Sequence, residues 1–197
     1  MNDWTGRVRA ALVRPGGPSS DFDLNPCTVL PEGRTLRAAG VLAAVEDTPD
    51  GPRLWLTQRS SVLKHHPGQI AFAGGKVDAG DDGPVGAALR EAREEIGLPE
   101  SHVEVLGTLP SHETVTGFNV TPVIARITAP FDVQVEPGEV AEAFTVPLAH
   151  VLEPANYVVE SRRWRGARRH YYAVPYGPYY IWGATARMLR GWADLMT

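Results

Sequence analysis

Residues 75–98 read GKVDAGDDGPVGAALREAREEIGL and hold the most informative pattern in the 197-residue chain. A helix is predicted over about residues 84–96, because Pro84 suits a first helical turn and Gly97 suits a helix end. The apolar side chains of this segment recur at helical spacing and form one narrow stripe for the core: Val85, Ala88, Leu89, Ala92 and Ile96. The charged residues therefore gather away from the core.

Three carboxylates crowd one patch of this predicted helix. Glu91 and Glu95 are four residues apart and Glu94 lies three after Glu91, so they share a face. Like charges at this spacing repel, which calls for a compensating cation, and Mg²⁺ is a hard cation that binds carboxylates and substrate phosphates. Arg90 could pair with Glu94 and fix the geometry of the cluster. The other interpretation is a solvated acidic face that pairs with Arg90 and Arg93.

The rest of the sequence alternates short strand patterns with turns. Expected strands cover residues 38–46, 53–59, 69–72, 103–109, 120–127, 139–146, 157–164 and 168–174, and expected helices residues 4–13 and 181–195. Residues 15–35 are rich in Pro, Gly, Asp and Asn, so we expect an irregular arm there. Many strands and few helices predict an α+β fold rather than a doubly wound parallel one.

The composition excludes several classes of function. The net charge is −4, so no general attraction to nucleic acid or to an anionic membrane is expected. The single cysteine, Cys27, allows neither an intramolecular disulfide nor a cysteine-based zinc site. No apolar stretch approaches the ~18 residues of a membrane span, and the N-terminus lacks a secretory pattern. We therefore expect a cytoplasmic protein in a reducing compartment.

Residues 162–165 and 168–170 form the strongest basic cluster of the chain, on a predicted hairpin with interleaved aromatic residues. One interpretation is a solvated hairpin and another is a nucleic-acid-binding surface. A third is a hairpin that packs over the substrate or over the partner subunit of a homodimer.

The segment around the acidic helix resembles the Nudix box. That pattern is a Gly, a spacer, an acidic residue, a second spacer, and then Arg-Glu-apolar-x-Glu-Glu-x-Gly-apolar. The match runs from Gly75 through Arg90 to Leu98, with one residue more than the common spacing between Gly75 and Arg90. Asp81 or Asp82 replaces the upstream Glu. The resemblance implies a Nudix-type α/β/α sandwich with a mixed sheet and a catalytic strand–loop–helix.

The residues before the box resemble the signature of the coenzyme A pyrophosphatase branch of this family. They read Leu56-Thr57-Gln58-Arg59-Ser60, then Lys64, Gly68 and Phe72-Ala73-Gly74-Gly75. Trp55, Lys64 and Ala73 depart from the signature, which has Leu, Arg and Pro there. The resemblance covers about residues 35–190, preceded by an N-terminal arm (1–34), and implies a single Nudix hydrolase domain over residues 1–197.

The resemblance also implies a reaction and a set of roles. The reaction is Mg²⁺-dependent hydrolysis of the pyrophosphate bond of coenzyme A or its thioesters, with Mn²⁺ as a further cofactor. The implied metal ligands are Glu91, Glu94, Glu95 and the Gly74 carbonyl. The implied catalytic residues are Arg90, Glu91 and Glu94. The implied substrate-binding residues are Arg59 and Lys64, with His65 or His66 as further candidates. The general base is open among Glu94, Glu91 and Glu139. The competing functions are hydrolysis of another nucleoside diphosphate derivative, such as ADP-ribose or NADH, and non-catalytic nucleotide binding.

Overall fold

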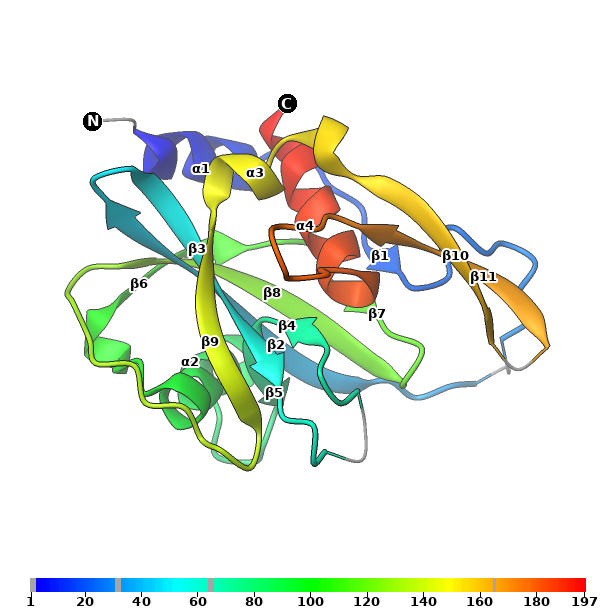
Figure 1. Ribbon diagram of the computed structural model, residues 1–197, viewed down its shortest axis with the longest axis horizontal. Helices are drawn as coiled ribbons and strands as arrows, with labels where there is room; N and C mark the ends of the chain where they lie inside the picture. Colours follow the sequence, from blue (N-terminus) through cyan, green and yellow to red (C-terminus); the bar gives the residue numbers. More distant parts are fainter. Residues whose placement is uncertain (1–2, 31–32, 64–65, 165) are drawn as a thin grey trace.

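A mixed β-sheet forms the centre of the computed structural model, which describes residues 3–30, 33–63, 66–164 and 166–197 (Figure 1). Its strands are β1 (Ser19–Ser20), β2 (Arg37–Thr48), β3 (Gly51–Arg59), β4 (Ile70–Ala71), β5 (Ala73–Lys76), β6 (Val103–Thr108), β7 (His112–Glu113), β8 (Phe118–Ile127) and β9 (Val140–Pro147). The order is β1-β7-β8-β2-β3-β4, and β5, β6 and β9 pair with β2, β8 and β3. The sheet is mixed because β2 runs parallel to β8 and antiparallel to β3 and β5.

A two-stranded hairpin and four α-helices complete the structure. The hairpin consists of β10 (Val158–Trp164) and β11 (Ala167–Ala173). The helices are α1 (Trp4–Leu12), α2 (Gly83–Ile96), α3 (Leu148–Val151) and α4 (Gly183–Met196), with single 3₁₀ turns at Glu100–His102 and Pro154–Asn156. No helix of the described residues is long and apolar enough to cross a membrane.

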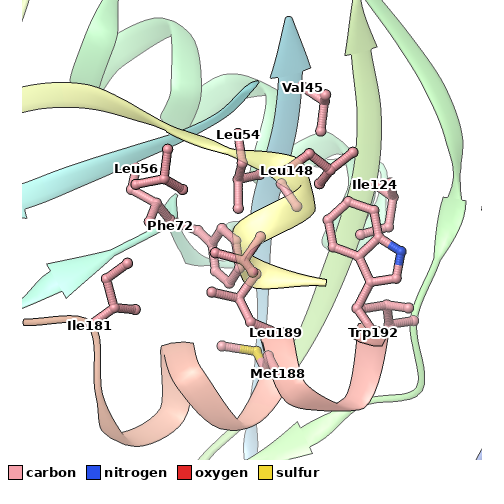
Figure 2. Close-up of a cluster of buried hydrophobic side chains, with 14 of the residues drawn as sticks. Val45, Leu54, Leu56, Phe72, Ile124, Leu148, Ile181, Met188, Leu189 and Trp192 are labelled. Atoms are coloured by element: carbon pink, nitrogen blue, oxygen red, sulfur yellow. The ribbon is translucent and has the colours of Figure 1, made fainter. Parts of the chain in front are cut away.

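Helices cover both faces of the sheet, because alternate residues of a strand point to opposite faces. On β2, Ala43 and Val45 belong to the core shared with α1, α3 and α4, whereas Leu42 and Ala44 belong to the core shared with α2. Figure 2 shows the first of these cores, where Trp192 of α4 packs with side chains of the central strands. This arrangement confirms the expected α+β fold with its α/β/α layers.

The predicted elements are confirmed with small shifts of their ends, with one informative exception. The strand expected at 69–72 is limited to β4, and a separate strand, β5, begins at Ala73 and pairs with β2. A Cβ on Gly74 would lie 2.5 Å from the backbone oxygen of Gly40, so only glycine fits this close approach. The described part of the arm also contains β1, which pairs in parallel with β7, and neither of these two-residue strands was predicted.

Candidate active site

The strand–loop–helix from β5 to α2 positions the acidic residues. The helix ends at Gly97, whose φ of 73° is the left-handed conformation that glycine adopts without strain. A loop over residues 128–139 then crosses this end of the helix. Its backbone N–H groups at Gln134 and Glu136 donate to the carbonyls of Ile96 (3.1 Å) and Glu95 (3.0 Å). The loop thus satisfies terminal carbonyls of α2 and carries Glu139 to the acidic face.

Three carboxylates meet at this point. One carboxylate oxygen each from Glu91, Glu95 and Glu139 lies within 4.8 Å of the other two. Glu95 is only 4% exposed, and its Oε2 has no hydrogen-bond partner among the described residues. Burial, and then the charge of Glu91, raises the pKa of Glu95 to about 8, and burial also raises the pKa of Glu91. A buried carboxylate with one unpaired oxygen is costly, and a divalent cation would offset that cost.

The chemistry of this donor set fits a hard divalent cation. Carboxylate oxygens are the ligands that Mg²⁺ and Mn²⁺ prefer, and Mg²⁺ keeps waters and substrate phosphates in its remaining positions. Glu139 is exposed, so the open side of the group faces solvent. A substrate phosphate can therefore reach a cation at this position.

Arg90 holds the acidic side chains in place. Its Nε and Nη2 donate to the two oxygens of Asp81 at 2.9 and 3.0 Å, and its Nη1 donates to Glu91 (2.9 Å) and Glu94 (3.0 Å). The bond to Asp81 is the main cause that raises the pKa of the guanidinium, and it lowers the pKa of Asp81. Asp81 is therefore the acid beside Arg90, whereas Asp82 precedes α2 as its N-cap.

The two glycines in the middle of β5 fit around these residues. A Cβ on Gly75 would lie 2.3 Å from Oε1 of Glu91, so the missing side chain makes room for that carboxylate. Gly74 lies beside Glu95, whose carboxylate accepts a backbone hydrogen bond from it. Gly74, whose carbonyl was predicted as a further metal ligand, is the register partner of Val41 on β2.

The sequence of the whole chain agrees with this geometry. The pattern of the NUDIX domain matches residues 35–165. The chain belongs to the Nudix family. It is 40% identical over 171 residues to a Salmonella heidelberg (strain SL476) protein named "Uncharacterized Nudix hydrolase NudL", with 87% of this chain and 88% of the relative covered. A Klebsiella pneumoniae protein of the same name is 42% identical over 154 residues, covering 78% of this chain and 80% of the relative.

Among solved structures, a Nudix hydrolase from M. smegmatis, RenU, has a TM-score of 0.50 and 27% sequence identity. The match covers 59% of this chain and 74% of that chain. Together with the relatives named Nudix hydrolases, this shows that the chain is a Nudix hydrolase, an enzyme for a nucleoside diphosphate linked to another group. Enzymes of this family generally use divalent metal ions.

The Nudix site brings together some of the predicted residues and not others. Glu91 and Glu95 lie in the three-carboxylate group, whereas Glu94 lies outside it, with a half-exposed side chain paired to Arg90. Glu139 was expected only as a candidate base. Its contribution to the group depends on the path of the 128–139 loop, and no local pattern in the sequence predicts that path.

Arg59 is the last residue of β3. Its charge opposes the rise in the pKa of Glu95, and its buried Nε has no hydrogen-bond partner among the described residues. The backbone holds it in place, because Arg59 N donates to the Gln69 carbonyl (2.9 Å) and Ser60 N donates to the Glu139 carbonyl (2.8 Å). A guanidinium with an unused donor beside a cation site suits a phosphate oxygen.

The other predicted binding residues divide into two groups. Lys64 and His65 lie outside the described residues. His66 lines a cavity of about 440 Å³ between the β10–β11 hairpin and the start of α4. Gln69, whose carbonyl accepts from Arg59, lines the same cavity, so one backbone hydrogen bond connects the cavity wall to Arg59.

Proposed function

We propose that this Nudix hydrolase cleaves the pyrophosphate bond of coenzyme A or a coenzyme A thioester, giving 3′,5′-ADP and (acyl) 4′-phosphopantetheine. The observation that carries the proposal is the position of Arg59. This residue belongs to the stretch that resembles the coenzyme A pyrophosphatase signature, and its charge acts directly on the carboxylate of Glu95. A diphosphate bound by Arg59 would therefore lie beside the carboxylate group.

The carboxylates would hold the metal ion. Glu91, Glu95 and Glu139 are the proposed ligands, with the Gly74 carbonyl as a further one and Mg²⁺ as the cofactor. When bound, a divalent cation neutralises phosphate oxygens and lowers the pKa of an attacking water. Mn²⁺ has the same preference for oxygen ligands and is the alternative.

The protein's own groups bind, orient and move protons. Arg59, with Lys64 as a second contact, binds the diphosphate oxygens, and Arg90 fixes Glu91 through its bond to Asp81. The oxygen of water bonds to one phosphorus, the bridging P–O bond breaks, and the leaving phosphate keeps the electron pair. A carboxylate accepts the proton that water loses.

The general base is one of Glu94, Glu91 and Glu139. Glu94 is the candidate that lies outside the proposed ligands, so its replacement leaves the cation group intact. If Glu94 is the base, Glu94→Gln lowers kcat while the enzyme still binds Mn²⁺ as tightly as the unmodified protein. Glu91→Gln, in contrast, is expected to weaken Mn²⁺ binding as well.

The proposal is tested by incubating the enzyme and Mg²⁺ with coenzyme A, acetyl-coenzyme A, ADP-ribose or NADH and separating the products. We expect 3′,5′-ADP from the two coenzyme A substrates. Glu91→Gln should lower this rate by about 100-fold or more, because it removes a proposed ligand of an ion that contributes several kcal/mol to catalysis. Arg93→Gln is the matched control, since Arg93 is an exposed charge on the same helix outside the proposed site, and it should keep full activity.

Other outcomes would contradict the proposal. Preferential cleavage of ADP-ribose or NADH would keep the Nudix site and overturn the coenzyme A specificity. Absence of turnover with any substrate would favour a non-catalytic nucleotide-binding domain. The presence of Arg90 and the glutamates argues against that function. A homodimer, a single domain over residues 1–197 and a cytoplasmic location remain predictions of the same proposal; light scattering would measure the oligomeric state.

A further inference from the structure

The cavity beside the site is built from parts of the chain that lie far apart in the sequence. It is lined by Arg162 and Arg169 of the β10–β11 hairpin, Trp182 just before α4, Asn25 of the N-terminal arm and Gln69 beside β4. Figure 1 shows this hairpin next to the segment that follows β1. The volume of about 440 Å³ is within the range of small-molecule sites.

The hairpin presents two guanidinium groups to this cavity. Arg162 and Arg169 are cross-strand partners and both line it. The next pair, Arg163 with Arg168, lies on the opposite face and is exposed. Like charges directly opposite each other on a sheet repel and destabilise it. An anion bound by both Arg162 and Arg169 would offset this repulsion, so the pair favours anion binding.

An acidic residue, Asp21, also lines the cavity, but its carboxylate is already engaged. One oxygen lies 3.2 Å from Nε2 of His112, and the other accepts the backbone N–H of Val115 at 2.8 Å. Arg162 and Arg169 are the guanidiniums that an anion in this cavity would meet.

Aromatic rings form another wall. Trp182 and Tyr171 have ring centroids 4.9 Å apart, and the guanidinium of Arg162 lies 4.4 Å from the Trp182 ring. A planar base can stack on such rings, and it does so with little dependence on base identity. The cavity thus combines a site for a planar ring with a site for an anion.

The walls are held in position before any ligand binds. The Asn25 side chain donates to the backbone carbonyl of His170 (2.9 Å) and accepts its N–H (2.8 Å), which ties the arm to β11. Gln69 ties the opposite side to Arg59 through the backbone. A ligand that spans the cavity and the carboxylates would therefore pass Arg59.

From these contacts we infer that the cavity binds the adenosine 3′-phosphate half of the substrate, with Arg162 and Arg169 on the 3′-phosphate and Trp182 and Tyr171 against the adenine. This inference rests on the proposed function and adds the part of the molecule that recognises the nucleotide. The other half, phosphopantetheine, has no planar ring and no second phosphate, so it offers neither a stacking partner for the aromatic wall nor a further anion for the guanidiniums.

The experiment compares coenzyme A with 3′-dephospho-coenzyme A in Arg162→Gln, Arg169→Gln and the unmodified enzyme. We expect each substitution to lower kcat/KM for coenzyme A by about 10- to 100-fold, the cost of one charge-assisted contact, and to leave the value for the dephospho substrate nearly unchanged. Arg163→Gln and Arg168→Gln remove the same charge from the other face of the same hairpin and should alter neither value. An equal loss on both substrates, or no loss, would overturn the inference.

Direct binding separates this inference from the proposed function. Calorimetry with 3′,5′-ADP and 5′-AMP needs no turnover, and we expect 3′,5′-ADP to bind more tightly in the unmodified protein and to lose that advantage in Arg162→Gln. Equal affinities for the two nucleotides would overturn the cavity assignment, whatever the enzyme hydrolyses. Failure of the proposed function has a different signature, the absence of 3′,5′-ADP among the products from coenzyme A.

Discussion

Gly74 and Gly75 are adjacent, yet the missing side chain serves a different purpose at each. At Gly75 the nearest atoms to an added Cβ belong to the carboxylate end of Glu91, a side chain that can move. At Gly74 the nearest atoms belong to the backbone of β2, at Gly40 and Val41, which cannot move without disturbing the sheet. Gly75 therefore leaves space for the Glu91 carboxylate, and Gly74 allows β5 to pair closely with β2.

This difference predicts that two alanine substitutions affect different properties, activity in one case and stability in the other. Gly75→Ala should displace Glu91 and lower kcat/KM by about 10-fold or more, with a thermal midpoint within a few degrees of the unmodified protein. Gly74→Ala should lower the free energy of unfolding by about 1–3 kcal/mol through overpacking against β2. Activity assays and urea unfolding of both variants check this; a Gly75→Ala enzyme with full activity would contradict the role given to Glu91.

Among the elements, the short strands β1 and β7 depend on a buried polar contact. His112 of β7 is fully buried, with Nδ1 2.9 Å from Oγ of Ser19 and Nε2 3.2 Å from Oδ1 of Asp21. The three side-chain types are those of a serine hydrolase triad, but His112 has no access to solvent or substrate. The contact is therefore structural, and it attaches the N-terminal arm to the sheet edge.

Replacement of this histidine should loosen the arm. His112→Leu leaves Ser19 and Asp21 without their buried partner, which we expect to cost about 1–3 kcal/mol of unfolding free energy for each group left unsatisfied. Ser19→Ala, which removes only one of the two contacts, is the milder comparison and should cost about 1 kcal/mol. Hydrogen exchange in residues 15–30 measures the loosening, and unchanged protection in His112→Leu would refute the contact's role.

The sequence predicts the elements that depend on local contacts and misses those that depend on distant ones. The helix at 84–96 and the longer strands were predictable because hydrophobic period and caps are local signals. β1 and β7 have two residues each, too few for any period. Glu139 joins Glu91 only through a loop that follows three further strands, β6, β7 and β8. The cavity beside the β10–β11 hairpin draws on both ends of the chain, so its lining could not be predicted from any single segment.

At the scale of the whole molecule, the sheet separates two cores, and the carboxylate group lies at the edge of the one that contains α2. Glu95 is buried there beside Ile96 and Ala92, so its ionisation is linked to the stability of the fold. Burial raises its pKa from an ordinary value of 4.5 to about 8. The folded protein thus holds this proton more tightly than the unfolded chain does.

The linkage predicts how stability depends on pH and metal. The contribution of the protonated Glu95 is present below about pH 4.5 and is lost as the pH rises through about 8, because the folded state must then bury a charge. The thermal midpoint of the metal-free enzyme should therefore fall by several degrees between about pH 5 and about pH 9, and Mg²⁺ should restore more of it at the higher pH. Calorimetry with and without a chelator measures both effects.

Glu95→Gln is the control for this linkage. The amide carries no charge at any pH, so the variant should show a flatter pH profile and a smaller response to Mg²⁺. An unchanged profile in Glu95→Gln would show that other groups determine the pH dependence.

The loop over residues 128–139 also constrains how the chain can evolve. The backbone N–H groups of Thr128, Gln134 and Glu136 bond to residues outside the loop, and the Glu139 carbonyl accepts the N–H of Ser60. The Phe131 ring also lies 5.5 Å from Trp55. An insertion or deletion of one residue between these points would shift Glu139 out of register with the helix it faces. Across natural descendants of this sequence, length changes should therefore be rarer in this loop than its Pro- and Gly-containing composition would suggest.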